Sequence, residues 1–585
     1  MPDRFIVLNG RATSLVLEHA GGTLLWRHWG ARLAEGVTLE PLQRTLPSFS
    51  LDHDIALSIC PTFGMGWFGQ SALLAHRDGR DFAQDFETCT VERRDDAELR
   101  IELKDAVTKL TVVVTLALDP DTDVLTTTTS LINTGRAPLD VQWLAAACLP
   151  LPPTAQHVRS WGGRHNNEFV QYDEPLGGAI WRRENRRGLT SHEGFPGSVV
   201  RGTDGTAWGA QLAWSGNHVQ TIEPLDDGRR QWQLGEWLAP GELRIAPGEA
   251  LTTPEVLATF SPDGTNGVAQ NFHAAIRARM IWPGGAMSPR PVHLNTWEAL
   301  YFDHKPDDLK SLADTAAAIG IERFVLDDGW FKGRNDDTTS LGDWTVDLGK
   351  YPDGLRPLAD HVTALGMEFG LWVEPEMVNP DSDLFSAHPD WALQIAGRPQ
   401  PTARNQLVLD LARPEVGDHL FEALSALLTD LPITYLKWDH NRALAPAAGA
   451  DGRPSYRRQV LGTYALLDRI CAAFPGVEIE SCAGGGGRID AGIAMRTHRF
   501  WTSDNNDAVS RIAIQRGFLQ FMPPELMGAH IGASPAHATG RRQSLDLRAL
   551  VAMPGHLGVE MDPRRLEPDD RNRLAAWIAR YKQWR

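Results

Sequence analysis

Hydrophobic and polar positions follow two different patterns along the 585-residue chain. Residues 1–262 carry short alternating or apolar runs, such as LRIELKD and LTVVVTLALD, separated by clusters of Gly, Pro, Asp and Asn. Alternation with a period of two is typical of strands, and helical periodicity is sparse in this half. Many short strands without helices between them predict an antiparallel β-sandwich over residues 1–262.

The pattern changes over residues 263–290. A turn cluster (SPDGTNG) precedes a helix-like run (NFHAAIRARMI) and a segment rich in Gly and Pro (WPGGAMSPRP). Gly and Pro are the strongest local breakers of regular structure, so a linker with a helical connection is expected here. It leads into a second predicted domain over residues 291–585.

The second half alternates between short apolar strands and helix-like runs. Eight strand candidates occur in this order: PVHLNTWE, RFVLDDGW, EFGLWVEPE, LVLDLARP, ITYLKWD, VEIESC, RFWTSD and ELMGAHI. Helix candidates between them include DLKSLADTAAAIG, LRPLADHVTALG, EVGDHLFEALSALLTDL and SYRRQVLGTYALLDRICAAF. Strands that alternate with helices indicate a parallel sheet covered on both faces, and eight such units predict a (β/α)8 barrel.

Polar side chains gather where these strands end. They are Trp297, Asp327, Asp328, Trp372, Glu374, Lys437, Asp439, Cys482 and Asp504. The active site of a (β/α)8 barrel lies at the carboxyl ends of its strands, so these residues are expected to converge there.

One segment, YLKWDHNR (435–442), ends a strand with a cation and a carboxylate. Lys437 and Asp439 stand two positions apart and share one strand face, where they form either a structural ion pair or part of a site. A nearby cation lowers a carboxyl pKa, so Lys437 is expected to keep Asp439 ionised. Glycoside hydrolysis commonly uses one ionised carboxylate and one protonated carboxyl group. Asp439 is then the predicted nucleophile and Asp504 the predicted acid, while Asp507 can cap the next helix.

Composition narrows the function classes. The net charge of −17 and the pI near 5.6 argue against an extended surface for nucleic acids or anionic membranes. No apolar run reaches membrane-spanning length, and no signal peptide is evident at the start of the sequence. The five cysteines are scattered, without a C-x-x-C pair, so a reducing cytoplasm is the expected location.

Other chemistries remain open at this point. Asp327, Asp328, Glu374 and Glu376 are candidate Mg²⁺ ligands, which with Lys437 as a base would suit a metal-dependent barrel isomerase or lyase. Alternatively, Asp327 and Asp328 accept hydrogen bonds from sugar hydroxyls or form a turn. The glycine-rich SCAGGGGR segment lacks the phosphate-loop pattern, and no histidine arrangement supports a thiol nucleophile at its cysteine.

The motifs together resemble glycoside hydrolase family 36, the microbial α-galactosidases. LDDGWF, GLWVEPEMVNPDSDLF, HPDWAL, YLKWDHNR, ESCAGGGGR, FWTSDNND and GAHIG occur in this order. The resemblance runs from Asn295 to Met561 and extends more loosely to FGMGWFG (63–69) and SHEGFPG (191–197). It implies an N-terminal β-supersandwich, a catalytic (β/α)8 TIM barrel, and retaining hydrolysis of terminal α-linked galactose without a metal or cofactor.

The resemblance also implies roles for single residues. Asp439 of the KWD motif is the implied nucleophile, and Asp504, the first aspartate of S-D-x-x-D, is the implied acid/base. The implied sugar-binding residues are Trp297, Asp327, Asp328, Trp372, Arg404, Lys437, Cys482 and Gly485. The expected substrates are small α-galactosides such as melibiose and raffinose.

The sequence departs from the family pattern at several places. His440 stands where methionine is more common after KWD, and Asn506 stands where threonine is common; both are expected to tune the region beyond the galactose pocket. The sequence stops where family members usually continue into a C-terminal β-domain, so that domain is expected to be absent. One branch of the family forms tetramers in which an aromatic side chain reaches a neighbouring subunit's site; Trp67 is the candidate here, in a homo-dimer or tetramer.

Four alternative functions remain. Two belong to the same family: an α-N-acetylgalactosaminidase and an α-galactosyl transferase. The others are the metal-dependent barrel enzyme and a carbohydrate-binding protein with an inactive site.

Overall fold

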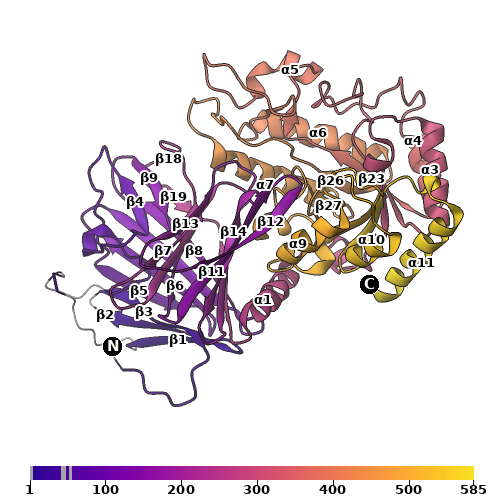
Figure 1. Ribbon diagram of the computed structural model, residues 1–585. Helices are drawn as coiled ribbons and strands as arrows, with labels where there is room; N and C mark the ends of the chain where they lie inside the picture. The colour runs from indigo at the N-terminus through magenta and orange to yellow at the C-terminus, as the bar shows by residue number, and fades with distance from the viewer. Residues whose placement is uncertain (1–3, 21, 41–47, 50, 52–55) are drawn as a thin grey trace.

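The computed structural model describes residues 4–20, 22–40, 48–49, 51 and 56–585. A β-rich domain and a barrel lie side by side, with helix α1 (Gly264–Arg279) near their junction (Figure 1). The predicted order of a β domain followed by a (β/α)8 barrel is confirmed.

The β domain consists of antiparallel sheets. Its strands are β1 (Phe5–Asn9), β2 (Thr13–Ala20), β3 (Thr23–Ala31), β4 (Leu73–His76), β5 (Thr88–Arg93), β6 (Glu98–Asp105), β7 (Leu110–Leu118), β8 (Val124–Asn133), β9 (Leu139–Leu144), β10 (Ala147–Leu151), β11 (Ala155–Arg164), β12 (Asn167–Pro175), β13 (Trp181–Asn185), β14 (Glu193–Gly202), β15 (Ala207–Leu212), β16 (His218–Pro224), β17 (Arg230–Glu236), β18 (Leu243–Ile245), β19 (Ala250–Thr252) and β20 (Val256–Ser261). The largest sheet has the order β12-β11-β14-β15-β20-β8-β7-β6-β5, with β19 paired to β8.

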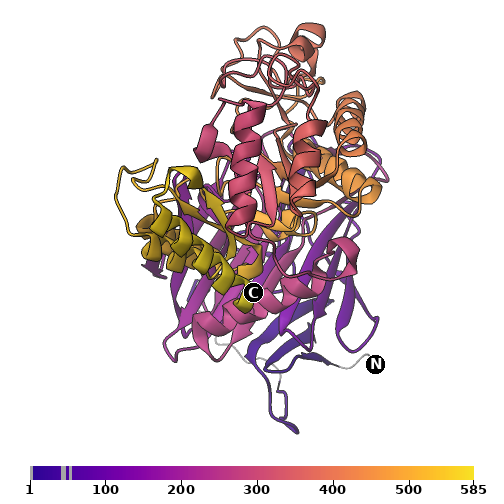
Figure 2. The ribbon, with the colours of Figure 1, turned by 90° about the vertical axis from the view of Figure 1, so that its right-hand side faces the viewer.

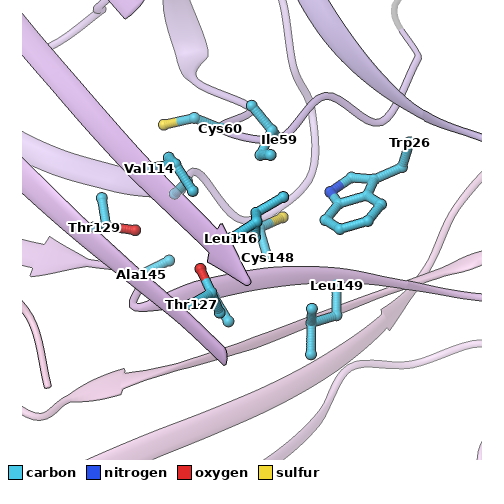
Figure 3. Close-up of a pocket in the computed structure, with 12 residues that line it drawn as sticks. Trp26, Ile59, Cys60, Val114, Leu116, Thr127, Thr129, Ala145, Cys148 and Leu149 are labelled. Atoms are coloured by element: carbon cyan, nitrogen blue, oxygen red, sulfur yellow. The ribbon is translucent and has the colours of Figure 1, made fainter. Parts of the chain in front are cut away.

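Alternation in the sequence explains how these strands bury one face. In β6, Leu99, Ile101 and Leu103 are buried, while the charged residues between them are not. A cavity of about 10 Å³ lies inside the domain, lined by Cys60, Cys148 and apolar side chains (Figure 3). That volume is about one water-sized probe, so this cavity is a packing void and not a ligand site.

The barrel closes through eight parallel strands. They are β21 (His293–Asn295), β22 (Arg323–Leu326), β23 (Glu368–Val373), β26 (Ile433–Trp438), β27 (Glu478–Ser481), β28 (Arg499–Trp501), β29 (Met527–Gly532) and β30 (His556–Glu560). Seven of the eight predicted strand segments overlap one of these strands, so the predicted barrel is confirmed with one error.

The error concerns LVLDLARP. This segment holds β25 (Leu407–Val408), which pairs antiparallel with β24 (Met377–Val378) outside the barrel. The barrel's eighth strand is β30, whose sequence HLGVE was not predicted. Leu407, Val408 and Leu409 are at most 4% exposed, so their apolar pattern reports burial and not membership of the barrel sheet.

Helices cover the barrel. The structure has α2 (Trp297–Leu300), α3 (Pro306–Ala318), α4 (Arg356–Ala364), α5 (Asp383–Ala387), α6 (Pro414–Asp430), α7 (Tyr456–Ala473), α8 (Ala491–Ala494), α9 (Ala508–Phe518), α10 (Leu545–Ala552) and α11 (Pro568–Trp584). Short 3-10 turns lie at Phe63–Met65, Pro283–Gly285, Pro389–Trp391, Pro524–Leu526 and Pro563–Arg565. In α6, a proline opens the helix, and Val416, Leu420 and Leu424 form a buried stripe at a spacing of four.

The C-terminal helix α11 lies on the outside of the barrel, as both views show (Figures 1 and 2). No helix in the described part of the chain is long and apolar enough to cross a membrane.

Candidate active site

The carboxyl ends of the barrel strands bring the predicted site residues together. Trp372 and Lys437 stand near the ends of β23 and β26, and Asp327, Asp439 and Asp504 follow the ends of β22, β26 and β28. Parallel strands in a closed barrel end at one rim, which explains why residues separated by long stretches of chain converge.

Asp439 is nearly buried, at 6% exposure, and its carboxylate accepts several hydrogen bonds. Trp372 Nε1 and Asn441 Nδ2 donate to Oδ2 at 3.1 and 2.6 Å, and the backbone N–H of His440 donates to Oδ1 at 2.8 Å. Donors on both oxygens fix the orientation of the carboxylate.

Lys437 pairs with a different carboxylate from the one expected. Its Nζ lies 2.8 Å from Asp327 Oδ2, and Asn295 Nδ2 donates to the same oxygen at 2.7 Å. Burial lowers the pKa of Lys437, but the charge of Asp327, with smaller effects from other groups including Asp439, holds it well above the usual value. Lys437 therefore acts on Asp439 by its charge, without a direct bond between them in the structure.

Asp328 forms a buried, two-pronged ion pair with Arg334. The guanidinium Nε and Nη2 lie 2.9 and 2.8 Å from Oδ1 and Oδ2, and the two residues are 4% and 1% exposed. The fork geometry of arginine matches a carboxylate and holds it in one orientation. The DDGW segment is thus fixed by a cation on each aspartate, Lys437 on one and Arg334 on the other.

Asp504 is more open, with 34% of its side chain exposed. Trp501 Nε1 donates to Oδ1 at 2.9 Å, and His165 Nε2 lies 2.8 Å from Oδ2. Burial raises the pKa of Asp504, but the hydrogen bond from His165 and the charges of His165, Lys437 and Arg404 outweigh it and bring the pKa to about 2. The predicted acid is therefore ionised in the free protein, contrary to the expectation of a protonated carboxyl away from Lys437.

His165 belongs to the β domain and was not predicted. It lies in the turn between β11 and β12, and this turn contacts three consecutive barrel residues. His165 pairs with Asp504, the carbonyl of Asn166 accepts from Asn505 Nδ2 at 3.0 Å, and Glu168 accepts from the hydroxyl of Ser503.

These contacts had little signal in the sequence. A polar turn between two strands of a separate domain looks like any surface hairpin. We name residues 164–168 the docking turn.

The glycine-rich segment lies between the docking turn and the acid/base candidate. A Cβ on Gly485 would meet the backbone nitrogen of Asp504 and Oε1 of Glu168, each at 2.7 Å. Gly485 also has φ +75°, which L side chains rarely adopt. The neighbouring Cys482 is 2% exposed, and burial raises the pKa of its thiol well above the usual value, so it is not a thiolate nucleophile.

Arg404 is an exposed residue whose charge acts on the same region. Partial desolvation of its guanidinium lowers its pKa, but the charges of Glu374, Asp439 and Asp504 raise it by more. Arg404 and Asn405 both have left-handed φ values, +50° and +60°. Consecutive residues of this kind cost backbone strain, which clusters at functional sites.

The other predicted pocket residue, Trp297, opens α2 and is partly exposed. Its ring packs edge-on against Tyr301 and Phe302.

Glu374 and Glu376 bond to protein groups and not to the DDGW aspartates. Gln406 Nε2 and the backbone N–H of Asn441 donate to Glu374, and burial, with the charge of Asp439, raises its pKa to about 8. Arg488 Nη1 lies 2.7 Å from Glu376. Among the described residues, no group of three or more His, Cys, Asp or Glu side chains could hold a metal ion, so the Mg²⁺ ligand set of the alternative interpretation is not assembled.

Three further residues named from the sequence are buried. Trp67 is 8% exposed in the core of the β domain, while its neighbour Phe68 is 80% exposed. His440 and Asn506 are 2% and 4% exposed, and their side chains bond to buried glutamates. At these two departures from the family pattern, hydrogen bonds to glutamates therefore hold the side chains in place.

Asp507 caps α9: its side chain accepts from the backbone N–H of Ser510 at 3.0 Å. The capping role given above as the alternative for Asp507 is therefore confirmed.

The barrel and its ring of carboxylates, tryptophans and hydrogen-bond donors define a glycoside hydrolase. The family model Melibiase matches residues 250–585, and the model of the glycosyl hydrolase family 36 N-terminal domain matches residues 22–246. The chain belongs to glycoside hydrolase family 36 and is a glycoside hydrolase of the α-galactosidase type.

Individual relatives of this chain are also α-galactosidases. The α-galactosidase of Escherichia coli is 43% identical over 584 residues, an alignment that covers 98% of this chain and 81% of that protein. The crystal structure of the α-galactosidase AgaA from Geobacillus stearothermophilus matches with a TM-score of 0.94 at 33% identity, over 99% of this chain and 86% of that one. Variants of AgaA are known in complex with stachyose and with raffinose.

Proposed function

We propose that the protein is a retaining exo-α-galactosidase that releases terminal galactose from small oligosaccharides such as melibiose and raffinose. The observation that carries the proposal is the pair of carboxylates Asp439 and Asp504 on separate strand ends, each oriented by a tryptophan N–H. The raffinose and stachyose complexes of AgaA support the substrate class.

The two carboxylates divide the chemistry. Asp439 attacks the anomeric carbon while Asp504 delivers a proton to the leaving oxygen, and a covalent galactosyl-enzyme forms. Asp504 then takes a proton from water, which attacks the intermediate and releases galactose with retained configuration. Two inversions at one carbon give net retention.

The remaining residues bind the sugar in this proposal. Asp327 and Asp328 accept hydrogen bonds from galactose hydroxyls, each held in place by its cation. Lys437 donates to a hydroxyl, Trp297, Trp372 and Arg404 line the pocket, and Cys482 and Gly485 lie near the 2-hydroxyl. The Cys482 and Gly485 motif resembles the galactose form of the family, which leaves little room for an acetamido group and favours galactose over N-acetylgalactosamine.

The first experiment follows the anomer released from 4-nitrophenyl α-galactoside by NMR, with and without EDTA. Initial release of α-galactose, unaffected by EDTA, is expected. Initial release of β-galactose would refute retention, and a loss of activity with EDTA would support the metal-dependent alternative.

Variants then assign the two carboxylates. Asp439→Ala should abolish hydrolysis, and azide should restore a slow reaction that gives β-galactosyl azide; an α-azide product would reassign Asp439. Asp504→Ala should lose roughly 10²- to 10⁴-fold on unactivated galactosides and much less on activated aryl galactosides, which need little protonation. Asp507→Asn is the matched control, because asparagine keeps the helix cap.

The cytoplasmic location, the homo-oligomer and a contact from Trp67 to a neighbouring subunit stay predictions.

A further inference from the structure

The two hydrogen-bond partners of Asp504 differ in what they can exchange. The indole N–H of Trp501 only donates, so it fixes Oδ1 but cannot exchange a proton with the carboxylate. The imidazole of His165, on Oδ2, can hold a proton or release it near neutral pH. His165 is therefore the partner through which Asp504 can gain or lose a proton inside the site.

The charges place that proton on the imidazole in the free protein. The hydrogen bond to Asp504 raises the pKa of His165; burial and Arg404 oppose this, while the charges of Asp504 and Glu168 add to it. The pKa of Asp504 lies at about 2 while that of His165 is raised, so the imidazole holds the shared proton more strongly than the carboxylate does. A general acid needs the proton on the carboxyl at the moment of bond cleavage.

Hydrogen bonds between the two domains hold the backbone around His165 in place. Next to it, Asn166 has φ +66° and Glu168 is fully buried at its side chain, and both bond to the barrel as described above. By contrast, the His165 side chain is 54% exposed, so its contact with Asp504 lies at the open side of the pair. The docking turn thus fixes the backbone while leaving the imidazole open to solvent.

We propose that His165 is a positioning residue that stores the proton of the acid/base Asp504 and takes it back in each turnover. The proposal rests on the role of Asp504 proposed above. During glycosylation the proton moves from Nε2 of His165 to Asp504, and from Asp504 to the glycosidic oxygen. The glycosidic bond breaks, Asp439 forms the ester, and His165 becomes neutral. During deglycosylation Asp504 takes a proton from the attacking water, and the proton returns to His165.

Other charged or titratable groups also act on this pair. They are Glu168 in the docking turn, Arg404 before β25, Lys437 on β26, Cys482 after β27, Glu298 on α2, Glu560 on β30 and Arg511 on α9. A substitution of His165 leaves all of these groups in place, so a comparison of the variant with the wild type reports the effect of the imidazole alone.

The test compares His165→Gln with His157→Gln, the same change at an exposed position of β11. The pH dependence of kcat/KM is measured on methyl α-galactoside, which needs a proton, and on 2-chloro-4-nitrophenyl α-galactoside, which needs little. In His165→Gln, the basic limb for methyl α-galactoside should move at least one unit to lower pH, with a roughly 10- to 100-fold loss at neutral pH. The activated substrate should change less than threefold. His157→Gln should match the wild type.

An unchanged basic limb, or equal losses on both substrates, would overturn the proposal. An independent readout is the NMR titration of the His165 imidazole, whose pKa should fall when Asp504 is replaced by asparagine; no fall would also overturn it. Hydrolysis by the wild-type chain tests the proposed function separately, because the NMR titration tests the pair whether or not the chain is active. Circular dichroism of each variant shows that it is folded.

Discussion

Replacing Gly485 by alanine should disable the site, while the same change at Gly484 should be tolerated. Both glycines have positive φ, +75° and +50°, so each substitution carries a left-handed strain of about 1–2 kcal/mol. Only at Gly485 does the new Cβ meet fixed atoms, because the backbone nitrogen of Asp504 lies 2.7 Å away. At Gly484 the nearest atoms are at 3.7 and 3.9 Å, which is ordinary contact.

The magnitude follows from these distances. Ordinary contact begins at 3.4 Å, so the backbone next to Asp504 must move by about 0.7 Å to admit the methyl group. A misplacement of about 1 Å in an active site can cost roughly 10²-fold in rate. Gly485→Ala should therefore lower kcat by roughly 10- to 100-fold, and overpacking should add about 1–3 kcal/mol of destabilisation to the strain that both variants share.

Initial rates on 4-nitrophenyl α-galactoside and thermal midpoints are measured for both variants beside the wild type. Gly484→Ala should keep kcat within about threefold, because a smaller displacement is needed there. If Gly485→Ala were as active as Gly484→Ala, the loop around Asp504 would not be held as tightly as the contacts indicate, and the reasoning would fail.

Two further predictions follow from buried charge. Trp372→Phe keeps an aromatic ring but removes the N–H donor to Asp439. Because a hydrogen bond to a charged group contributes about 1.5–3 kcal/mol, kcat/KM should fall roughly 10- to 100-fold. Unchanged kinetics would contradict the orienting role of Trp372. Burial raises the pKa of Glu478, but the charges of Arg323 and Arg290 outweigh it and lower the pKa from 4.5 to about 2. As the pH falls from 4.5 toward 2, the Glu478 carboxylate stays ionised in the folded state while it takes up a proton in the unfolded chain. The carboxylate therefore stabilises the fold above pH 4.5, and this stabilisation is lost as the pH falls toward 2. The difference in thermal midpoint between wild type and Glu478→Gln should therefore be largest above pH 4.5 and shrink below it; a gap independent of pH would contradict this assignment.

The strand-end aspartates could be predicted from the sequence because two simple rules act together. Short apolar strands that alternate with helices give the barrel, and the barrel rule places Asp327, Asp439 and Asp504 at one rim. Neither rule says which neighbour a side chain meets. The period of two predicts that Lys437 and Asp439 share one face, but in the structure the lysine bonds to Asp327, which follows β22.

Two kinds of feature could not be predicted in this way. The segment around Leu407 was wrongly predicted as a barrel strand, and the true strand β30 was missed. Apolar patterning reports burial, and long loops over a barrel also bury apolar residues. His165 was missed because its partner lies 339 residues away, in another domain. The sequence of a polar turn does not show which residues contact it in the folded protein.

The docking turn also bears on how the enzyme regains activity after unfolding. Domains generally fold as units, so the β domain and the barrel can each form their own core before they meet. The loop that holds Asp504 reaches its final surroundings only after the turn from the β domain has closed a contact across 339 residues. Refolding followed by intrinsic tryptophan fluorescence should therefore run ahead of the return of hydrolysis, with a lag that reports domain docking.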